Sequence, residues 1–122
     1  MLPEWDRYCG WRDAFEAVID PRYYTMDWLD LQILNGPVGF WGNEKAALIA
    51  EIKEYPTGAR DVHCLIAAGE MSEIVETLAP KALAWGAAQS CIAGLVESRP
   101  GWAKILKPHG WEAHQQTLRK EL

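Results

Sequence analysis

The sequence predicts an α+β fold in which a mixed, mostly antiparallel sheet carries helices on its faces. Over the first 35 residues, apolar side chains recur at three- and four-residue intervals, as they do on the buried side of a helix. From residue 38 to residue 67, apolar runs alternate with short turns rich in Gly, Asn and Pro, which is typical of antiparallel strands. From residue 62 to residue 96, a strand, a helix and a second strand follow in order, which indicates a right-handed parallel crossover.

Two helices are expected first. One runs from Trp5 to Ile19, can break at Gly10 and ends at Asp20-Pro21; its inward residues are Trp5, Tyr8, Trp11, Phe15, Val18 and Ile19. The other runs from Tyr24 to Leu34, with Thr25 as its N-cap and Asn35-Gly36-Pro37 as its stop. Its inward residues are expected to be Trp28, Leu31 and either Ile33 or Leu34.

Extended structure follows the helices. Strands are expected over Val38–Trp41 and Ala46–Tyr55, joined by the polar turn 42–45 into an antiparallel hairpin. After a second turn at residues 56–59, the almost unbroken apolar run Val62–Ala67 predicts a buried central strand.

The crossover helix is expected from Ser72 to about Ser90. Ser72 is a suitable N-cap, and the acidic Glu73 and Glu76 suit the first turn. Pro80 should kink the helix or split it in two. Its buried side should comprise Ile74, Val75, Leu78, Leu83 and Trp85.

The last third of the chain predicts a strand, a short helix and a final strand. Ile92–Val96 is the strand, and Trp102, Ile105 and Leu106 fall at helical spacing. Gly110 can take the left-handed conformation that ends many helices, and Trp111 should begin the last extended segment.

Length and composition exclude several classes of protein. With 122 residues and 49% hydrophobic content, the chain fits a single domain, 1–122, made of aromatic-rich helices (1–35) and a sheet core with crossover helices (36–122). The net charge of −5 and the scattered basic residues argue against nucleic-acid binding. No apolar run is long enough to cross a membrane and no signal peptide is evident, so we expect a cytoplasmic protein.

The cysteines and histidine give no sign of a metal or thiol site. Cys9, Cys64 and Cys91 are odd in number and widely spaced, so neither a disulfide framework nor a zinc site is expected. His63 and Cys64 are adjacent on a strand and therefore point to opposite faces, which prevents them from sharing a proton.

The order of elements and the pair Gly110-Trp111 resemble the GNAT superfamily of acyl-CoA N-acyltransferases. In that family two helices precede a hairpin, a central strand leads into a long helix, and a strand-helix-strand ends in a Gly-aromatic pair. Arg99 stands where the family often has Asn, and Leu106 stands where it often has Tyr.

The resemblance implies which residues would contact coenzyme A. The cofactor contacts would be Ile66, Ala67, Gly69 and Ser72, on the segment 67–73 and the strand before it. Glu70 and Glu73 in the same segment would repel a pyrophosphate. Leu106 has no proton for a departing thiolate, so the resemblance comes without the family's usual acid.

The candidate catalytic residues, if the protein is active, are Glu54, His63 and Glu97. Glu51 is a further candidate base. Glu51 and Glu54 can equally be solvated strand carboxylates, and His63 can be a hydrogen-bonded structural residue. Glu97-Ser98-Arg99, at a strand end, is the best polar cluster, although a local salt bridge and helix cap explain it as well.

Seven Trp residues are many for a chain of this size, and most should be core. Those of the first helix, Trp5 and Trp11 with Tyr8, are interface candidates, and with Tyr23 and Tyr24 they could form an exposed aromatic patch. An acidic, Trp-rich surface suits a protein partner better than a polyanion or a lipid.

Three hypotheses about function follow. The first is a GNAT-like domain without a cofactor that has lost acyl transfer and acts through protein contacts; the resemblance is to short members of tailed phages and prophages, with a structural or accessory role and a cytoplasmic or virion-associated location. The second is an active N-acetyltransferase that uses acetyl-CoA through an atypical cofactor loop. The third is an inhibitor of a host enzyme. The sequence leaves homo-oligomer formation open.

Overall fold

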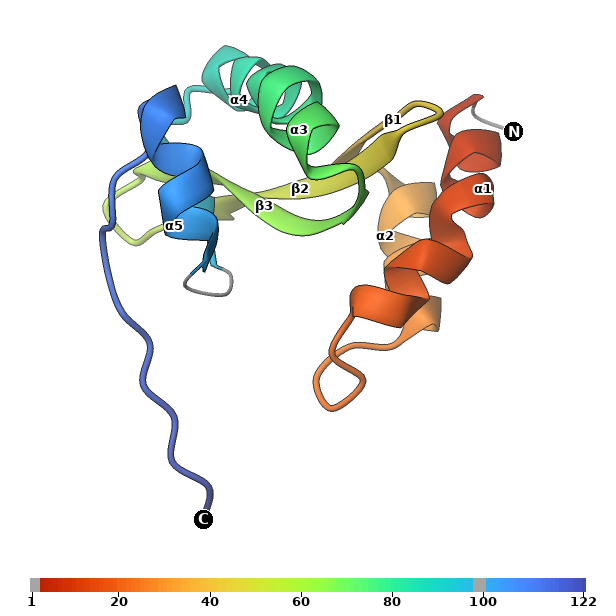
Figure 1. Ribbon diagram of the computed structural model, residues 1–122, viewed down its shortest axis with the longest axis horizontal. Helices are drawn as coiled ribbons and strands as arrows, with labels where there is room; N and C mark the ends of the chain where they lie inside the picture. Colours follow the sequence, from red (N-terminus) through yellow and green to blue (C-terminus); the bar gives the residue numbers. More distant parts are fainter. Residues whose placement is uncertain (1–2, 98–100) are drawn as a thin grey trace.

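The sheet of this protein contains four strands in the order β1-β2-β3-β4. In the computed structural model, which describes residues 3–97 and 101–122, β1 (Val38–Gly42), β2 (Ala46–Glu54) and β3 (Arg60–Gly69) pair antiparallel, and β4 (Ala93–Val96) pairs parallel to β3. The helices are α1 (Pro3–Val18), α2 (Met26–Asn35), α3 (Met71–Glu73), α4 (Ala79–Ala88) and α5 (Gly101–Leu106) (Figure 1). A mixed sheet with a parallel strand-helix-strand unit is therefore confirmed.

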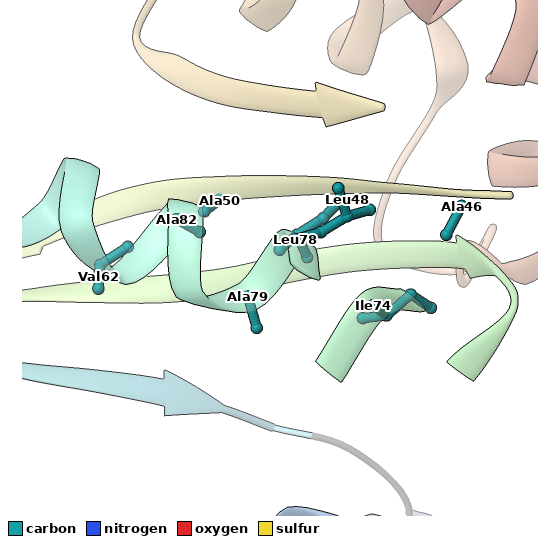
Figure 2. Packing of buried hydrophobic residues seen from close by; sticks show 8 residues of the cluster. All are labelled: Ala46, Leu48, Ala50, Val62, Ile74, Leu78, Ala79 and Ala82. Carbon is teal, nitrogen blue, oxygen red and sulfur yellow. The ribbon is translucent and has the colours of Figure 1, made fainter. Parts of the chain in front are cut away.

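The two faces of the sheet carry separate hydrophobic clusters because side chains alternate along each strand. On one face, residues of β2 and β3 pack against the helical segment that follows β3; the buried members are Ala46, Leu48, Ala50, Val62, Ile74, Leu78, Ala79 and Ala82 (Figure 2). On the other face, α1 and α2 pack on the sheet; the buried members are Tyr8, Phe15, Leu29, Ile33, Ala47, Ile49 and Ala68.

The first helix is continuous through Gly10, so the break considered from the sequence does not occur. Trp11 holds α1 to the β1–β2 turn, because its Nε1 donates a hydrogen bond of 2.9 Å to the carbonyl of Asn43. Val18, expected to face inward, is exposed at the end of the helix.

The second helix begins at Met26, two residues later than expected, with the expected N-cap, and it turns a different side to the core. Thr25 is the N-cap, with its hydroxyl accepting from Trp28 N–H at 3.1 Å, and Gly36 ends the helix with φ +77°. Leu29 and Ile33 are buried, whereas Leu31 and Leu34 are 54% and 51% exposed. The expected inward position of Leu31 was therefore wrong.

The crossover helix begins at Met71 and is continuous to Ala88. Glu70 is its N-cap residue and makes no side-chain cap, so Ser72 lies inside the first turn and the expected Ser72 cap was wrong. A π-helical turn, η1 (Ile74–Leu78), precedes Pro80, and Ala79 N–H donates to the carbonyl of Ile74 five residues back. We infer that the wider turn accommodates the proline ring without a break.

The end of the chain differs most from expectation. After α5, the 3₁₀ turn η2 (Lys107–His109) ends at Gly110, whose φ of +88° confirms the predicted glycine stop. The expected strand from Trp111 is absent: residues 111–122 form neither helix nor strand and run as an extended trace (Figure 1). Among the described residues, no helix has the length and apolarity needed to span a bilayer.

Candidate functional site

A buried histidine lies between two carboxylates on the α1/α2 face of the sheet. His63 on β3 is 7% exposed; its Nδ1 is 3.7 Å from Oε1 of Glu51 on β2, and its Nε2 is 3.7 Å from Oε1 of Glu97 after β4. The strand register brings them together, because His63 pairs with Glu51 on one side and with Leu95 on the other. His63 Nδ1 is buried and has no hydrogen-bond partner among the described residues.

Lys53 completes this polar cluster of Glu51, Lys53, His63 and Glu97. Its Nζ donates to Glu97 Oε1 at 3.1 Å. This hydrogen bond lowers the pKa of Glu97 against the effect of partial burial, and the charge of Lys53 lowers it further. Glu97 is therefore ionised at neutral pH, where it can orient the imidazole and stabilise a proton on it.

The polar cluster contains two of the three candidate catalytic residues. His63 and Glu97 meet, whereas Glu54 lies at the exposed end of β2, paired in register with Arg60. Glu54 is three residues from Glu51, so strand alternation turns it to the other face of the sheet. Glu51 takes the place expected for Glu54, and Ser98 and Arg99 lie outside the described residues.

An apolar pocket of about 180 Å³ lies on the same face, next along β3. Its lining residues are Val18, Ile19, Asp20, Tyr24, Trp28, Leu29, Leu65 and Ile66. Leu65 and Ile66 are consecutive, yet both line it, because Ile49 pairs with Ile66 and Ala50 pairs with Cys64, which leaves Leu65 without a partner in the ladder. This irregularity places the pocket two residues beyond His63, and sequence alternation gave no signal of it.

The loop between β3 and α3 packs against the β1–β2 turn. Gly69 has φ +101°, and a Cβ there would lie 2.4 Å from the carbonyl oxygen of Lys45, so only glycine fits. Glu70 N–H donates to that same oxygen at 2.9 Å. The loop is thus built around the hairpin backbone.

The four candidate coenzyme A contacts do not gather into one cradle. Ile66 lines the pocket on the α1/α2 face, whereas Ala67 packs against the cluster on the opposite face. Ser72 is exposed in the first turn of α3. Glu70 and Glu73 place two carboxylates at that helix start, so the residues present do not fit a pyrophosphate.

The parallel pairing between β3 and β4 is short. It joins Asp61–Cys64 to Ala93–Val96, while β3 continues to Gly69 without a parallel partner in the described chain. Leu106, at the expected Tyr position, is buried. No group of His, Cys, Asp and Glu in the described residues is suited to hold a metal ion.

The three cysteines differ in their exposure to solvent. Burial raises the pKa of Cys64 to about 11, so this thiol stays protonated at neutral pH and is a poor nucleophile. Cys9 is exposed, Cys91 is half-buried, and all three cysteines are free.

Two exposed aromatic side chains lie at the connection between α1 and α2, and a third, Tyr55, lies in the β2–β3 turn. Tyr8 is fully buried, so it cannot belong to an exposed patch, and Trp5 and Trp11 are half-buried. Tyr23 and Tyr24 are 58% and 39% exposed. We call the exposed or half-exposed apolar residues at this place the α1–α2 surface; it comprises Val18, Tyr24 and Trp28, which line the pocket, and Tyr23, the neighbour of Tyr24 in the chain.

Comparison with known proteins supports the fold. No protein-family model and no curated protein matches the sequence. Among solved structures, an acetyltransferase from Trypanosoma brucei matches with a TM-score of 0.71 and 10% identity, over 100% of this chain and 97% of that one. A predicted acetyltransferase with acetyl-CoA from Clostridium acetobutylicum matches with a TM-score of 0.71 and 10% identity, over 96% of this chain and 91% of that one. A GCN5-related N-acetyltransferase from Ralstonia eutropha matches with a TM-score of 0.66 and 18% identity, over 94% of this chain and 87% of that one. The chain therefore has the GNAT acetyltransferase fold.

Proposed function

We propose that this chain is a GNAT-fold domain that has lost acyl transfer and acts through contacts with a protein partner. The start of α3 carries the proposal, because its N-cap residue Glu70 and its residue Glu73 place carboxylates where a pyrophosphate needs hydrogen-bond donors. The backbone amide of Glu70 is already bonded to Lys45, so that donor serves the protein itself. The alkyl side chain of Leu106 supplies no acid for a leaving thiolate.

The α1–α2 surface is the contact region that suits a partner best. Tyr23 and Tyr24 expose large side chains, and exposed aromatic residues beside a pocket are typical anchors of protein interfaces. The pocket accepts one apolar side chain of a partner. By resemblance to phage and prophage members, we place this role in a phage structural or accessory protein.

Binding measurements with matched tyrosine variants test the protein contact. A partner captured with the full-length protein is purified and titrated into the wild type, Tyr24→Ala and Tyr55→Ala. The two tyrosines are 39% and 38% exposed, but Tyr55 lies in the β2–β3 turn. We expect Tyr24→Ala to weaken binding about tenfold or more, and Tyr55→Ala to leave it unchanged. Equal affinities for all three proteins would contradict the proposed surface.

Acyl transfer is the second candidate, and the polar cluster is the observation that favours it. His63 lies beside the ionised Glu97, and its Nδ1 has no hydrogen-bond partner among the described residues. Leu65, two residues further along β3, lines the apolar pocket. An imidazole so placed can accept a proton from an amine. If a panel of primary amines with acetyl-CoA shows turnover, His63→Ala should lower the rate by about 10²- to 10⁴-fold and Glu54→Gln should not.

A further inference from the structure

The C-terminal segment ends on the connection between α1 and α2. Residues 111–122 have no regular secondary structure, yet the Arg119 guanidinium donates to the Tyr23 hydroxyl and lies 5.5 Å from the centre of that ring. Arg119 also binds both carboxylate oxygens of Glu121, at 2.7 and 3.2 Å. The side chain of Arg119 thus reaches the connection between α1 and α2.

The connection between α1 and α2 supplies complementary charges. Arg22 Nη1 lies 3.9 Å from Glu121 Oε1, and Arg22 Nη2 lies 3.0 Å from Asp20 Oδ2. Arg22 also lies 5.4 Å from the Tyr23 ring centre, so two guanidinium groups contact one aromatic ring. Asp20, Arg22, Glu121 and Arg119 therefore alternate in charge along the contact.

We propose that the connection between α1 and α2 is a docking surface whose occupant is the chain's own C-terminal segment, residues 119–121, bound within the same molecule. The docking point adjoins the apolar pocket, because Asp20 and Tyr24 line that pocket and flank the two residues that hold the segment. The docking itself is independent of the proposed function. Its consequence rests on that function: a partner at the α1–α2 surface competes with the segment.

The ion pairs that hold residues 119–121 are weak enough to break and re-form. The side chains of Arg119, Glu121 and Arg22 are 48%, 74% and 60% exposed, so their ion pairs are weak and screened by salt. The preceding residues, 112–118, are exposed and form no ion pair or hydrogen bond within the described parts of the chain. The segment is thus held at its end and connected by a flexible stretch, which suits reversible docking.

NMR relaxation of the full-length protein tests the docking with a matched pair of variants. At low salt, amides 119–121 should have higher order parameters than amides 113–117, because only residues 119–121 are held by side-chain contacts. Arg119→Ala should reduce the values at 119–121 below about 0.6 and shift the amide signals of Arg22 and Tyr23. Lys120→Ala removes the same charge from a neighbour that forms no ion pair among the described residues, and should change neither.

Three results would overturn the inference. Order parameters below about 0.6 at residues 119–121 in the wild type would mean that the segment is free. Equal effects of Arg119→Ala and Lys120→Ala would mean that only net charge matters. A molecular mass that doubles with concentration in the wild type but not in Arg119→Ala would mean that the segment docks on a second copy. A docked segment that no protein partner displaces would contradict the proposed function and leave the docking intact.

Discussion

Asp30 on α2 holds two polar groups of α1 at once. It accepts a hydrogen bond of 2.5 Å from the Tyr8 hydroxyl and a bidentate pair, each bond 3.0 Å, from Arg12. Partial burial opposes ionisation, but these hydrogen bonds and the charge of Arg12 outweigh it and lower the pKa of Asp30. Asp30, for which the sequence predicted no role, is therefore the main polar link between α1 and α2.

Asp30→Asn should lower the free energy of unfolding at pH 7 by about 1–3 kcal/mol, because the buried Tyr8 hydroxyl and Arg12 lose a charged acceptor. The pKa of Asp30 is lower in the folded state, so its contribution is complete above the unfolded value, near 4, and is lost as pH falls through the folded value. Urea unfolding at pH 7 and pH 3 checks this. A difference between the proteins that is as large at pH 3 as at pH 7 would contradict the assignment.

The three thiols should react in the order of their exposure. Cys9 is exposed, whereas burial raises the pKa of Cys64 to about 11. At pH 8 we expect iodoacetamide to modify Cys9 rapidly and Cys64 only after denaturation, since the thiolate is the reactive form. Mass spectrometry of the modified peptides measures both rates. Rapid modification of Cys64 in the native protein would mean that the β3 face is open.

At the scale of elements, replacing either of two helical glycines by alanine should have opposite effects on the free energy of unfolding. A Cβ at Gly86 on α4 would lie 2.6 Å from Cβ of Val62 on β3, whereas nothing lies within 4 Å of one at Gly10 on α1. Gly86→Ala should therefore destabilise the protein by about 1–3 kcal/mol through overpacking. Gly10→Ala should stabilise it by about 0.5–1 kcal/mol through helix propensity. Thermal unfolding of both variants checks the pair, and a stabilising Gly86→Ala would refute the close helix–sheet packing.

Local chemistry predicted the helix and turn boundaries well. Thr25 caps α2, and Gly36 and Gly110 adopt the left-handed conformation expected at helix ends. The incorrect predictions for Leu31 and Trp111 concern features that depend on contacts with other parts of the chain. Leu31 has helical spacing, but contacts with α1 decide that Leu29 and Ile33 face inward. Trp111 begins an extended segment, but no neighbouring strand pairs with it in the described chain.

At the scale of the whole molecule, the sequence located half of the candidate site. It identified His63 and Glu97, because both are polar residues on or beside apolar strands. It could not choose between Glu51 and Glu54, since register across two strands places only Glu51 against His63. The pocket could not be predicted either, because it depends on the irregular pairing of β2 with β3 at Leu65.

If this GNAT-fold domain has lost acyl transfer as we propose, it should not bind coenzyme A. Isothermal titration of the full-length protein with acetyl-CoA and with free coenzyme A tests it, and the double variant Glu70→Gln, Glu73→Gln tests the reason by removing both charges from the helix start. We expect no heat from the wild type at millimolar ligand, and tighter binding in the double variant, because it lacks the two carboxylates that repel a pyrophosphate. Micromolar binding by the wild type, about −8 kcal/mol, would contradict the loss of acyl transfer and favour an active acyltransferase.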